Sequence, residues 1–435
     1  MRICFVYPSY KKHSDSNPEL RGLVSTGSYL GSPTLSIALL AGMTPDRHEV
    51  VFYDDRIEKV PFDEPFDLVA MPVFTAAAPR AMEIADTFRE RGVKVVTGGI
   101  FSSLMPQEMA PHVDAVCIGE GEPVWHQILE DAERGELKPV YHAEGFYDLA
   151  ELPAPRFDLY IAKEGPGGYR STGKRSEATV DYALPISRGC PLRCMSCVIP
   201  EYMGRQMRFA PPEWVAKSFE ALGADGKSRY VSLAEDTSTF PAARVFAHFD
   251  EAMALAEGKG PPVSYVGASP MQCMIAKDGF FERLRRLDAM SIYMVFGFDR
   301  ASQGAFAAET SRKAYQECLD AVARVHDQGL SVYASLLVGH DAEDESVFDK
   351  VLEYAERAKI RTAEFVILTP YPGTPLWRRL VKEDRLITRD FSRYNDANAT
   401  FQPKGYSAER LREGYLHMWQ SFYRDRDQAR HHIQI

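Results

Sequence analysis

Three cysteines lie within eight residues of one another, in the segment Ser187-Arg-Gly-Cys190-Pro-Leu-Arg-Cys194-Met-Ser-Cys197. Thiolates are good ligands for iron–sulfur clusters, and a four-iron cluster is normally saturated by four of them. No fourth cysteine or histidine is nearby, because the next cysteine along the chain is Cys273. One iron would therefore stay open to a small chelating ligand. A structural zinc site is normally closed by four ligands, so the spacing favours a reactive cluster over a zinc ribbon or three ordinary buried cysteines.

The elements that must position this segment form a series of short apolar runs, each followed by a helical pattern. Six such units predict an incomplete βα barrel over residues 181–380, with its working residues at the carboxyl ends of the strands. The cysteine segment directly follows the first strand. The expected strands are Ala183–Ser187, Tyr230–Ala234, Val263–Gly267, Ile292–Phe298, Val332–Val338 and Glu364–Thr369.

The first 135 residues show the same alternation of strands and helices, which predicts a doubly wound, Rossmann-like parallel sheet covered on both faces. Ligands of such sheets bind outside the carboxyl ends of the strands. Residues 136–180 are rich in proline and glycine and are expected to be a linker, and residues 381–435 a helical C-terminal extension. The predicted class is thus α/β. The expected strands of the first domain are Ile3–Tyr7, Glu49–Tyr53, Leu68–Pro72, Val93–Thr97 and Ala115–Ile118.

The composition is that of a globular protein with two or three domains, since 45% of the 435 residues are hydrophobic and 26% are charged. A net charge of −10 argues against a large nucleic-acid surface. No apolar run approaches the roughly 20 residues of a membrane span, and the N-terminus predicts a β-strand rather than a signal peptide. We therefore expect a cytoplasmic protein with no nucleic-acid partner.

The cysteine segment resembles the signature of the radical S-adenosylmethionine superfamily, and the resemblance extends over nearly all of residues 181–380. In that superfamily the open iron is chelated by the amino and carboxylate groups of S-adenosylmethionine. The resemblance implies that Glu235 and Asp236, after the second strand, contact the methionine ammonium, and that Asp299, after the fourth, binds the ribose. Carboxylates suit the ammonium because they accept charge-assisted hydrogen bonds. Ser196 departs from the aromatic residue usual before the third cysteine, which affects the usual adenine contact and not the cluster.

Residues 1–135 resemble the cobalamin-binding domain that precedes the barrel in one branch of this superfamily. Gly98-Gly99 alone would equally suit a tight turn, but paired glycines also let a backbone approach a large flat ligand closely. No histidine stands at the ligand position in Asp54-Asp-Arg-Ile-Glu-Lys59, so base-off cobalamin without a histidine ligand from the chain is expected. The cobalamin contacts implied by the resemblance are Phe74, Thr75, Gly98, Gly99, Gly119 and Glu120.

The resemblance implies an enzyme that methylates an unactivated carbon of a small-molecule or lipid substrate, through a 5′-deoxyadenosyl radical and methylcobalamin. An external one-electron reductant of flavodoxin or ferredoxin type would supply electrons. A non-methylating cyclisation or ring rearrangement with the same cofactors fits the same residues. A methylthiotransferase would carry three more cluster cysteines in the first domain, where only Cys4 and Cys117 occur. A non-catalytic cofactor-binding module is disfavoured by the acidic strand ends.

Overall fold

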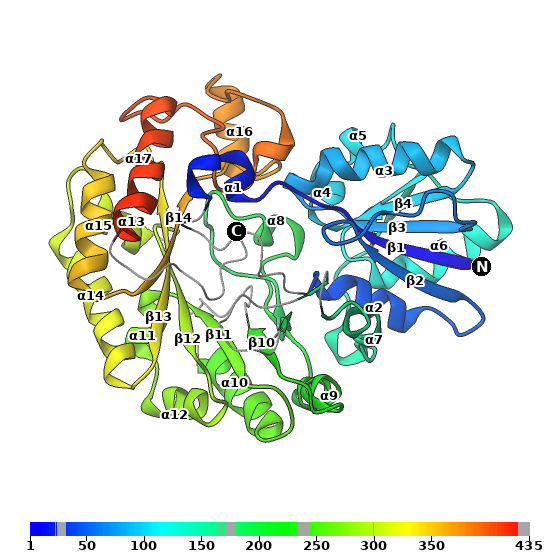
Figure 1. Ribbon diagram of the computed structural model, residues 1–435, viewed down its shortest axis with the longest axis horizontal. Helices are drawn as coiled ribbons and strands as arrows, with labels where there is room; N and C mark the ends of the chain where they lie inside the picture. Colours follow the sequence, from blue (N-terminus) through cyan, green and yellow to red (C-terminus); the bar gives the residue numbers. More distant parts are fainter. Residues whose placement is uncertain are drawn as a thin grey trace.

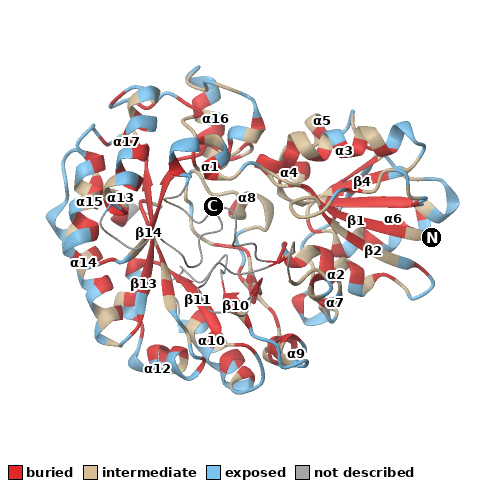
Figure 2. Ribbon diagram, in the orientation of Figure 1, coloured by how far each residue is buried: buried red, intermediate tan, exposed pale blue. Residues whose placement is uncertain are grey.

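The computed structural model describes residues 1–21, 23, 32–165, 168–169, 180–233, 243–298 and 300–424, apart from the side chains of residues 300 and 301. Two parallel six-stranded sheets lie beside each other, each covered by helices (Figure 1). Figure 2 shows that the strands are buried in both sheets, whereas the helices expose their outward faces. None of the helices within the described residues is long and apolar enough to cross a membrane.

The first sheet has the strand order β2-β1-β3-β4-β5-β6, and all its strands are parallel. The strand order reverses between β1 and β3, and such a switch point opens a crevice at the carboxyl ends of the strands. Helix α3 covers one face, and α2 and α6 cover the other (Figure 1). The elements are β1 Arg2–Tyr7, α2 Leu35–Met43, β2 Glu49–Asp54, β3 Leu68–Pro72, η2 Thr75–Ala77, α3 Ala78–Glu90, β4 Lys94–Gly98, α4 Gly99–Leu104, α5 Pro106–Met109, β5 Ala115–Ile118, η3 Glu122–Val124, α6 Trp125–Arg134 and β6 Val140–His142.

Strand β6 lies in the segment that we expected to be a linker. It pairs with β5, with Val116 opposite Val140. Only its middle residue is buried, so three residues carry too little periodicity to be recognised as a strand. The same segment also contains η4 Leu149–Glu151 and α7 Asp158–Ile161.

The second sheet is the predicted partial barrel, with the strand order β14-β13-β12-β11-β10-β7 and parallel pairing throughout. Its helices are amphipathic; in α14, for example, the buried residues recur every three or four positions. The elements are β7 Val180–Ala183, α9 Pro212–Gly223, β10 Arg229–Leu233, α10 Ala243–Ala256, β11 Val263–Ala268, α11 Pro270–Ile275, α12 Asp278–Arg286, β12 Ser291–Phe296, α13 Arg300–Phe306, α14 Arg312–Asp327, β13 Ser331–Val338, α15 Val347–Arg357 and β14 Thr362–Ile367.

A short antiparallel ribbon interrupts the barrel after its first strand. It pairs β8 Ser187–Arg188 with β9 Arg208–Phe209, and the cysteine segment and α8 Ile199–Tyr202 lie between the two. The expected strand Ala183–Ser187 is therefore wrong in extent, because β7 ends at Ala183. Pro185 lacks the N–H that would continue the ladder, and Ser187 belongs to the ribbon instead.

The C-terminal extension packs against the last barrel strand. Helix α17 Ala408–Phe422 lies beside β14, where the Tyr423 hydroxyl donates a hydrogen bond of 2.6 Å to the Ala363 carbonyl. Before it come α16 Pro375–Lys382 and η5 Phe391–Arg393. The N-terminal helices α1 His13–Ser16 and η1 Pro18–Leu20 lie nearby. The Asn17 amide between them donates a hydrogen bond to the Ala397 carbonyl. The α/β class with a helical C-terminus is confirmed, although most of residues 383–407 are irregular.

Candidate functional site

A large cavity lies where the first sheet meets the barrel. It encloses about 1610 Å³ of empty space, part of it open to solvent. One wall is the switch point of the first sheet, with the ends of β1, β3 and β4, and the other is the segment leading to β8, together with α8 and α9. The lining is mostly apolar and suits a large ligand. It includes Phe5, Tyr7, Leu35, Ile37, Met71, Val73, Phe74, Gly98, Gly99, Trp125, Arg188, Tyr202, Met203 and Trp214.

Four of the six residues predicted to contact cobalamin line this cavity, namely Phe74, Gly98, Gly99 and Glu120. Thr75 is buried at the start of η2, and neither it nor Gly119 is part of the lining.

The two neighbouring glycines are needed for different reasons. Gly99 has φ of +86°, and a Cβ there would sit 3.0 Å from the Val73 nitrogen, so the backbone itself requires glycine. Gly98 has φ of −140°, which any residue adopts, and a Cβ would only contact Cys117 at 3.5 Å. Gly98 therefore leaves the end of β4 bare where it faces the cavity.

The loop of residues 54–59, which has no histidine at the ligand position, contains a buried ion pair. The Arg56 guanidinium donates to both carboxylate oxygens of Asp54, with Nη2 to Oδ2 at 2.6 Å and Nε to Oδ1 at 2.9 Å. Asp54 also accepts a hydrogen bond of 2.8 Å from the Tyr169 hydroxyl. The guanidinium lies 4.6 Å from the ring centre of Tyr7, which lines the cavity. Among the described residues of the lining, none is a histidine.

The three cysteines lie in the loop between β8 and α8. Cys190 is buried, whereas Cys194 and Cys197 are partly exposed. The Cys190 N–H donates to the Gly204 carbonyl at 3.0 Å, and the Leu376 N–H at the start of α16 donates to the Met195 carbonyl at 2.9 Å. The loop is therefore held at two points, by the segment that leads back to β9 and by the start of α16.

Across the described ranges, no three His, Cys, Asp or Glu side chains are grouped so as to hold one metal ion. A four-iron cluster makes a different demand, because its thiolates bind separate irons. The donor chemistry of the cysteine loop, three thiols within one short segment, suits such a cluster.

Four charged residues connect the cavity wall to the cysteine loop. Glu122 accepts a hydrogen bond of 2.6 Å from Arg188, and Glu120 contacts Arg188 at 3.2 Å and Arg208 at 2.7 Å. Burial acts to raise the pKa of Glu120, but hydrogen bonds from Arg208 and the charge of Arg188 hold that pKa below its ordinary value. Glu120 is thus an ionised partner of two arginines. Sequence reasoning missed both arginines, because nothing in their local pattern shows which acids they meet.

Glu235, Asp236 and Asp299, the residues predicted to bind S-adenosylmethionine, lie outside the described residues. The strands that lead to them, β10 and β12, end at Leu233 and Phe296.

Two carboxyl groups lie beyond the ends of β13 and β14, and of these Glu343 is buried and Asp396 is half-buried. Glu343 accepts hydrogen bonds from the N–H groups of Gly339 and His340 and from the Tyr406 hydroxyl, and burial raises its pKa to about 8. Burial also raises the pKa of Asp396 to about 6, and Asp396 accepts a bond of 2.8 Å from the Tyr371 hydroxyl. Asp396 carries no sequence signal, since it lies in an irregular loop.

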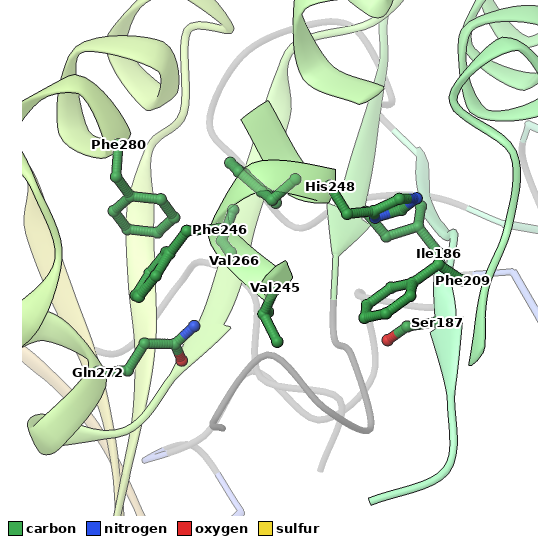
Figure 3. Close-up of a pocket in the computed structure, with 10 residues that line it drawn as sticks. Ile186, Ser187, Phe209, Val245, Phe246, His248, Val266, Gln272 and Phe280 are labelled. Atoms are coloured by element: carbon green, nitrogen blue, oxygen red, sulfur yellow. The ribbon is translucent and has the colours of Figure 1, made fainter. Parts of the chain in front are cut away.

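A second, narrow pocket lies on the barrel side of the β8–β9 ribbon (Figure 3). Half of its lining residues are aromatic, with Phe209 and His248 at one end and Phe280 at the other. The Gln272 side chain reaches toward the centre of the pocket in Figure 3. Ser187 lines both this pocket and the large cavity, so the ribbon is the partition between them.

Comparisons with known proteins agree with this architecture. The model of the B12 binding domain matches residues 24–129, and a domain of unknown function (DUF4070) matches residues 374–430. The bacteriochlorophyllide d C-8(2)-methyltransferase of Chlorobaculum tepidum is 25% identical over 394 residues, covering 86% of this chain and 81% of that protein. The anaerobic magnesium-protoporphyrin IX monomethyl ester cyclase of Cereibacter sphaeroides is 24% identical over 456 residues, covering 97% and 70%.

Two solved structures share the fold. One is the radical S-adenosylmethionine methyltransferase TsrM from Kitasatospora setae with cobalamin and a [4Fe-4S] cluster bound, with a TM-score of 0.61 at 14% identity over 88% of this chain and 78% of that one. The other is the cobalamin-dependent S-adenosylmethionine radical enzyme OxsB, with a TM-score of 0.62 at 14% identity over 93% and 64%.

Fold and site together define an α/β enzyme with a B12-binding domain in front of a partial barrel. Residues 24–129 match the B12 binding domain, and the chain shares its fold with cobalamin-dependent radical S-adenosylmethionine enzymes.

Proposed function

We propose that this chain is a cobalamin-dependent radical S-adenosylmethionine enzyme that methylates an unactivated carbon of a small-molecule or lipid substrate. One observation carries the proposal. The cavity at the switch point of the B12-binding domain is closed on its far side by Ser187 and Arg188, which lead directly into the cysteine loop. A corrinoid in this cavity would therefore adjoin a cluster on that loop. Relatives of similar length, such as the bacteriochlorophyllide methyltransferase, support methylation.

Cys190, Cys194 and Cys197 would hold three irons of a [4Fe–4S] cluster and leave the fourth to S-adenosylmethionine. Together the cluster, S-adenosylmethionine and cobalamin supply, when bound, a carbon-centred radical and a methyl donor. The residues of the chain bind and orient these groups, with Glu235 and Asp236 for the methionine ammonium and Asp299 for the ribose. An external reductant of flavodoxin or ferredoxin type would supply electrons.

The apolar cavity wall would exclude water from the reacting groups, which suppresses side reactions of a radical. Gly98 would let the corrin ring lie against the end of β4. Because Arg56 is held by Asp54 and no histidine lines the described cavity wall, cobalamin would bind base-off without a histidine ligand from the chain.

A non-methylating cyclisation is the second candidate, and the cyclase of Cereibacter sphaeroides, which matches 97% of this chain, favours it. The two functions differ in stoichiometry. A methylase consumes S-adenosylmethionine both as methyl source and as radical source, whereas a cyclase needs it only as radical source.

The test uses the anaerobically reconstituted protein, a one-electron reductant and S-adenosylmethionine labelled in its methyl group, with panels of tetrapyrrole and lipid substrates. We expect 5′-deoxyadenosine, S-adenosylhomocysteine and labelled product. 5′-Deoxyadenosine with an unlabelled, rearranged product would favour the cyclase. S-adenosylmethionine cleavage by protein that binds no corrinoid would refute both.

A further inference from the structure

Two arginines face each other across the ribbon that carries the cysteine loop. Arg188 in β8 is the direct register partner of Arg208 in β9. Like charges directly opposite on an antiparallel pair repel each other and destabilise the pairing. Both guanidinium groups are also largely shielded from water, since each side chain is only 14% exposed. This ribbon therefore depends on negative charge supplied from elsewhere.

The negative charge comes from the other domain. Glu120 and Glu122 follow strand β5 of the first sheet, and their side chains are 1% and 6% exposed. Glu122 pairs with Arg188 at 2.6 Å. Glu120 contacts both arginines. Arg208 donates two hydrogen bonds to its carboxylate, from Nη2 to Oε1 at 2.7 Å and from Nη1 to Oε2 at 3.0 Å. Two positive charges thus meet two negative charges across the domain boundary.

The contact balances the four charges and also fixes the relative orientation of the groups that carry them. A guanidinium fork that holds both oxygens of a carboxylate fixes their relative orientation, which a single point charge does not. The Tyr147 N–H donates to Glu120 at 2.7 Å, and the Arg208 guanidinium lies 4.7 Å from the ring centre of Phe146. The segment after β6 therefore also contacts this network, in addition to the β8–β9 ribbon and the segment after β5.

The network is joined to the first cysteine by one closely packed glycine. Only Gly189 separates Arg188 from Cys190, and Gly189 has φ of +83° with its missing Cβ position 2.3 Å from the Gln206 carbonyl oxygen. The Cys190 N–H donates a hydrogen bond to the Gly204 carbonyl, in the segment between α8 and β9. A displacement of Arg188 would therefore carry Cys190 with it.

We propose that Glu120, Glu122, Arg188 and Arg208 are positioning residues, which set the distance between the corrinoid cavity and the cysteine loop. The inference rests on the proposed function for the identity of the two cofactors. Radical formation needs only the barrel, whereas methyl transfer needs both domains in register. Small misplacements of reacting groups can reduce a rate by about a hundredfold. Loss of the network should uncouple the two steps rather than abolish both.

The experiment compares Arg188→Met and Glu122→Gln with the wild type, and uses Arg229→Met as a matched control. Arg229 is also a buried arginine, paired with Glu164 and Asp225, but it lies at the start of β10 and lines neither pocket. The first readout is hydrogen exchange by mass spectrometry on protein without cofactors. The second is the amount of 5′-deoxyadenosine formed per labelled product in the reconstituted enzyme.

We expect amide exchange to become about tenfold faster in residues 119–124, 187–190 and 204–209 of Arg188→Met, with strands β11 to β14 unchanged. The ratio of 5′-deoxyadenosine to product should rise by about tenfold or more. Arg229→Met should leave both readouts in these segments at wild-type values. Arg188→Lys keeps the charge but lacks the two guanidinium nitrogens that contact Glu120 and Glu122. It should fall between Arg188→Met and wild type, and replaces Arg188→Met if that variant does not fold.

Wild-type exchange in the three segments of both Arg188 variants would overturn the proposal, as would a wild-type product ratio. A similar loss of cleavage and methylation would also overturn it, because that pattern indicates a folding defect. If the wild type cleaves S-adenosylmethionine without methylating any substrate, the proposed function fails, and the exchange data still decide whether the network holds the two domains together.

Discussion

At the scale of single residues, the sequence identified the chemistry of a side chain more readily than its partners. Cysteine spacing predicts a cluster loop, and that loop lies next to the barrel as expected. Glu120 was predicted to contact cobalamin and does line the cavity, yet its carboxylate is held by Arg188 and Arg208. Those partners follow it by 68 and 88 residues. No local pattern encodes a contact over that distance, because the contact depends on how two domains pack.

Replacing Cys190, Cys194 or Cys197 by alanine should remove the proposed cluster or leave a degraded one, since each thiolate would fill a coordination site that water cannot replace. The measurement is iron and sulfide per chain, with the visible absorbance of the reconstituted protein. Cys273→Ala is the control, because Cys273 is fully buried and burial raises the pKa of its thiol to about 12. It should keep its iron at a packing cost of about 1–3 kcal/mol. Full iron content in a variant lacking two of the three loop cysteines would contradict the ligand assignment.

At the scale of elements, strands with long buried runs were predictable and short ones were not. Apart from β7, the main strands of both sheets lie close to their expected positions, because continuous apolar runs mark parallel strands buried on both faces. Strand β6 and the β8–β9 ribbon were missed, since two or three residues contain no periodicity. The shapes of loops were equally hard to predict. The loop after β13, for example, is shaped by Glu343 accepting hydrogen bonds from two backbone N–H groups.

That loop makes stability depend on pH. Burial raises the pKa of Glu343 from 4.5 to about 8, more than its three hydrogen-bond donors lower it. Between these values the folded protein keeps a proton that the unfolded chain releases, so stability should fall as pH rises across this window. One proton contributes at most about 1.4 kcal/mol per pH unit. Glu343→Gln should flatten this slope, as measured by urea unfolding at about pH 6 and about pH 8. An equally steep slope in the variant would exclude Glu343 as its source.

At the scale of the whole molecule, the cavity is built by both domains and neither one closes it alone. The switch point of the first sheet supplies β1, β3 and β4, and the barrel supplies the segment from Ala183 to Arg188 with α8 and α9. Sequence patterns predict each layer separately, because they report burial within an element. They do not report the relative placement of two sheets, which is set by contacts such as those between Glu122 and Arg188.

Gly98→Leu should prevent corrinoid binding and leave the cluster intact. The extended backbone at Gly98 accepts any residue, and a Cβ there meets only Cys117, so the added side chain extends into the cavity rather than straining β4. Gly99 would be a poorer choice, because its positive φ would make any substitution damage the fold. Gly279→Leu is the control, since it adds the same side chain to an exposed position of α12 with nothing within 4 Å.

The measurement is corrinoid per chain after reconstitution with hydroxocobalamin and gel filtration, with iron per chain from the same sample. Wild type and Gly279→Leu should retain about one corrinoid, and Gly98→Leu should retain little, because the leucine occupies space that a flat ring needs next to the strand end. Iron should be equal in all three, since Gly204 and Leu376, which hold the cysteine loop by hydrogen bonds, both lie outside the first domain. Corrinoid retained by Gly98→Leu at the wild-type level would mean that the ring does not lie against β4, and the cavity would then have to serve another ligand.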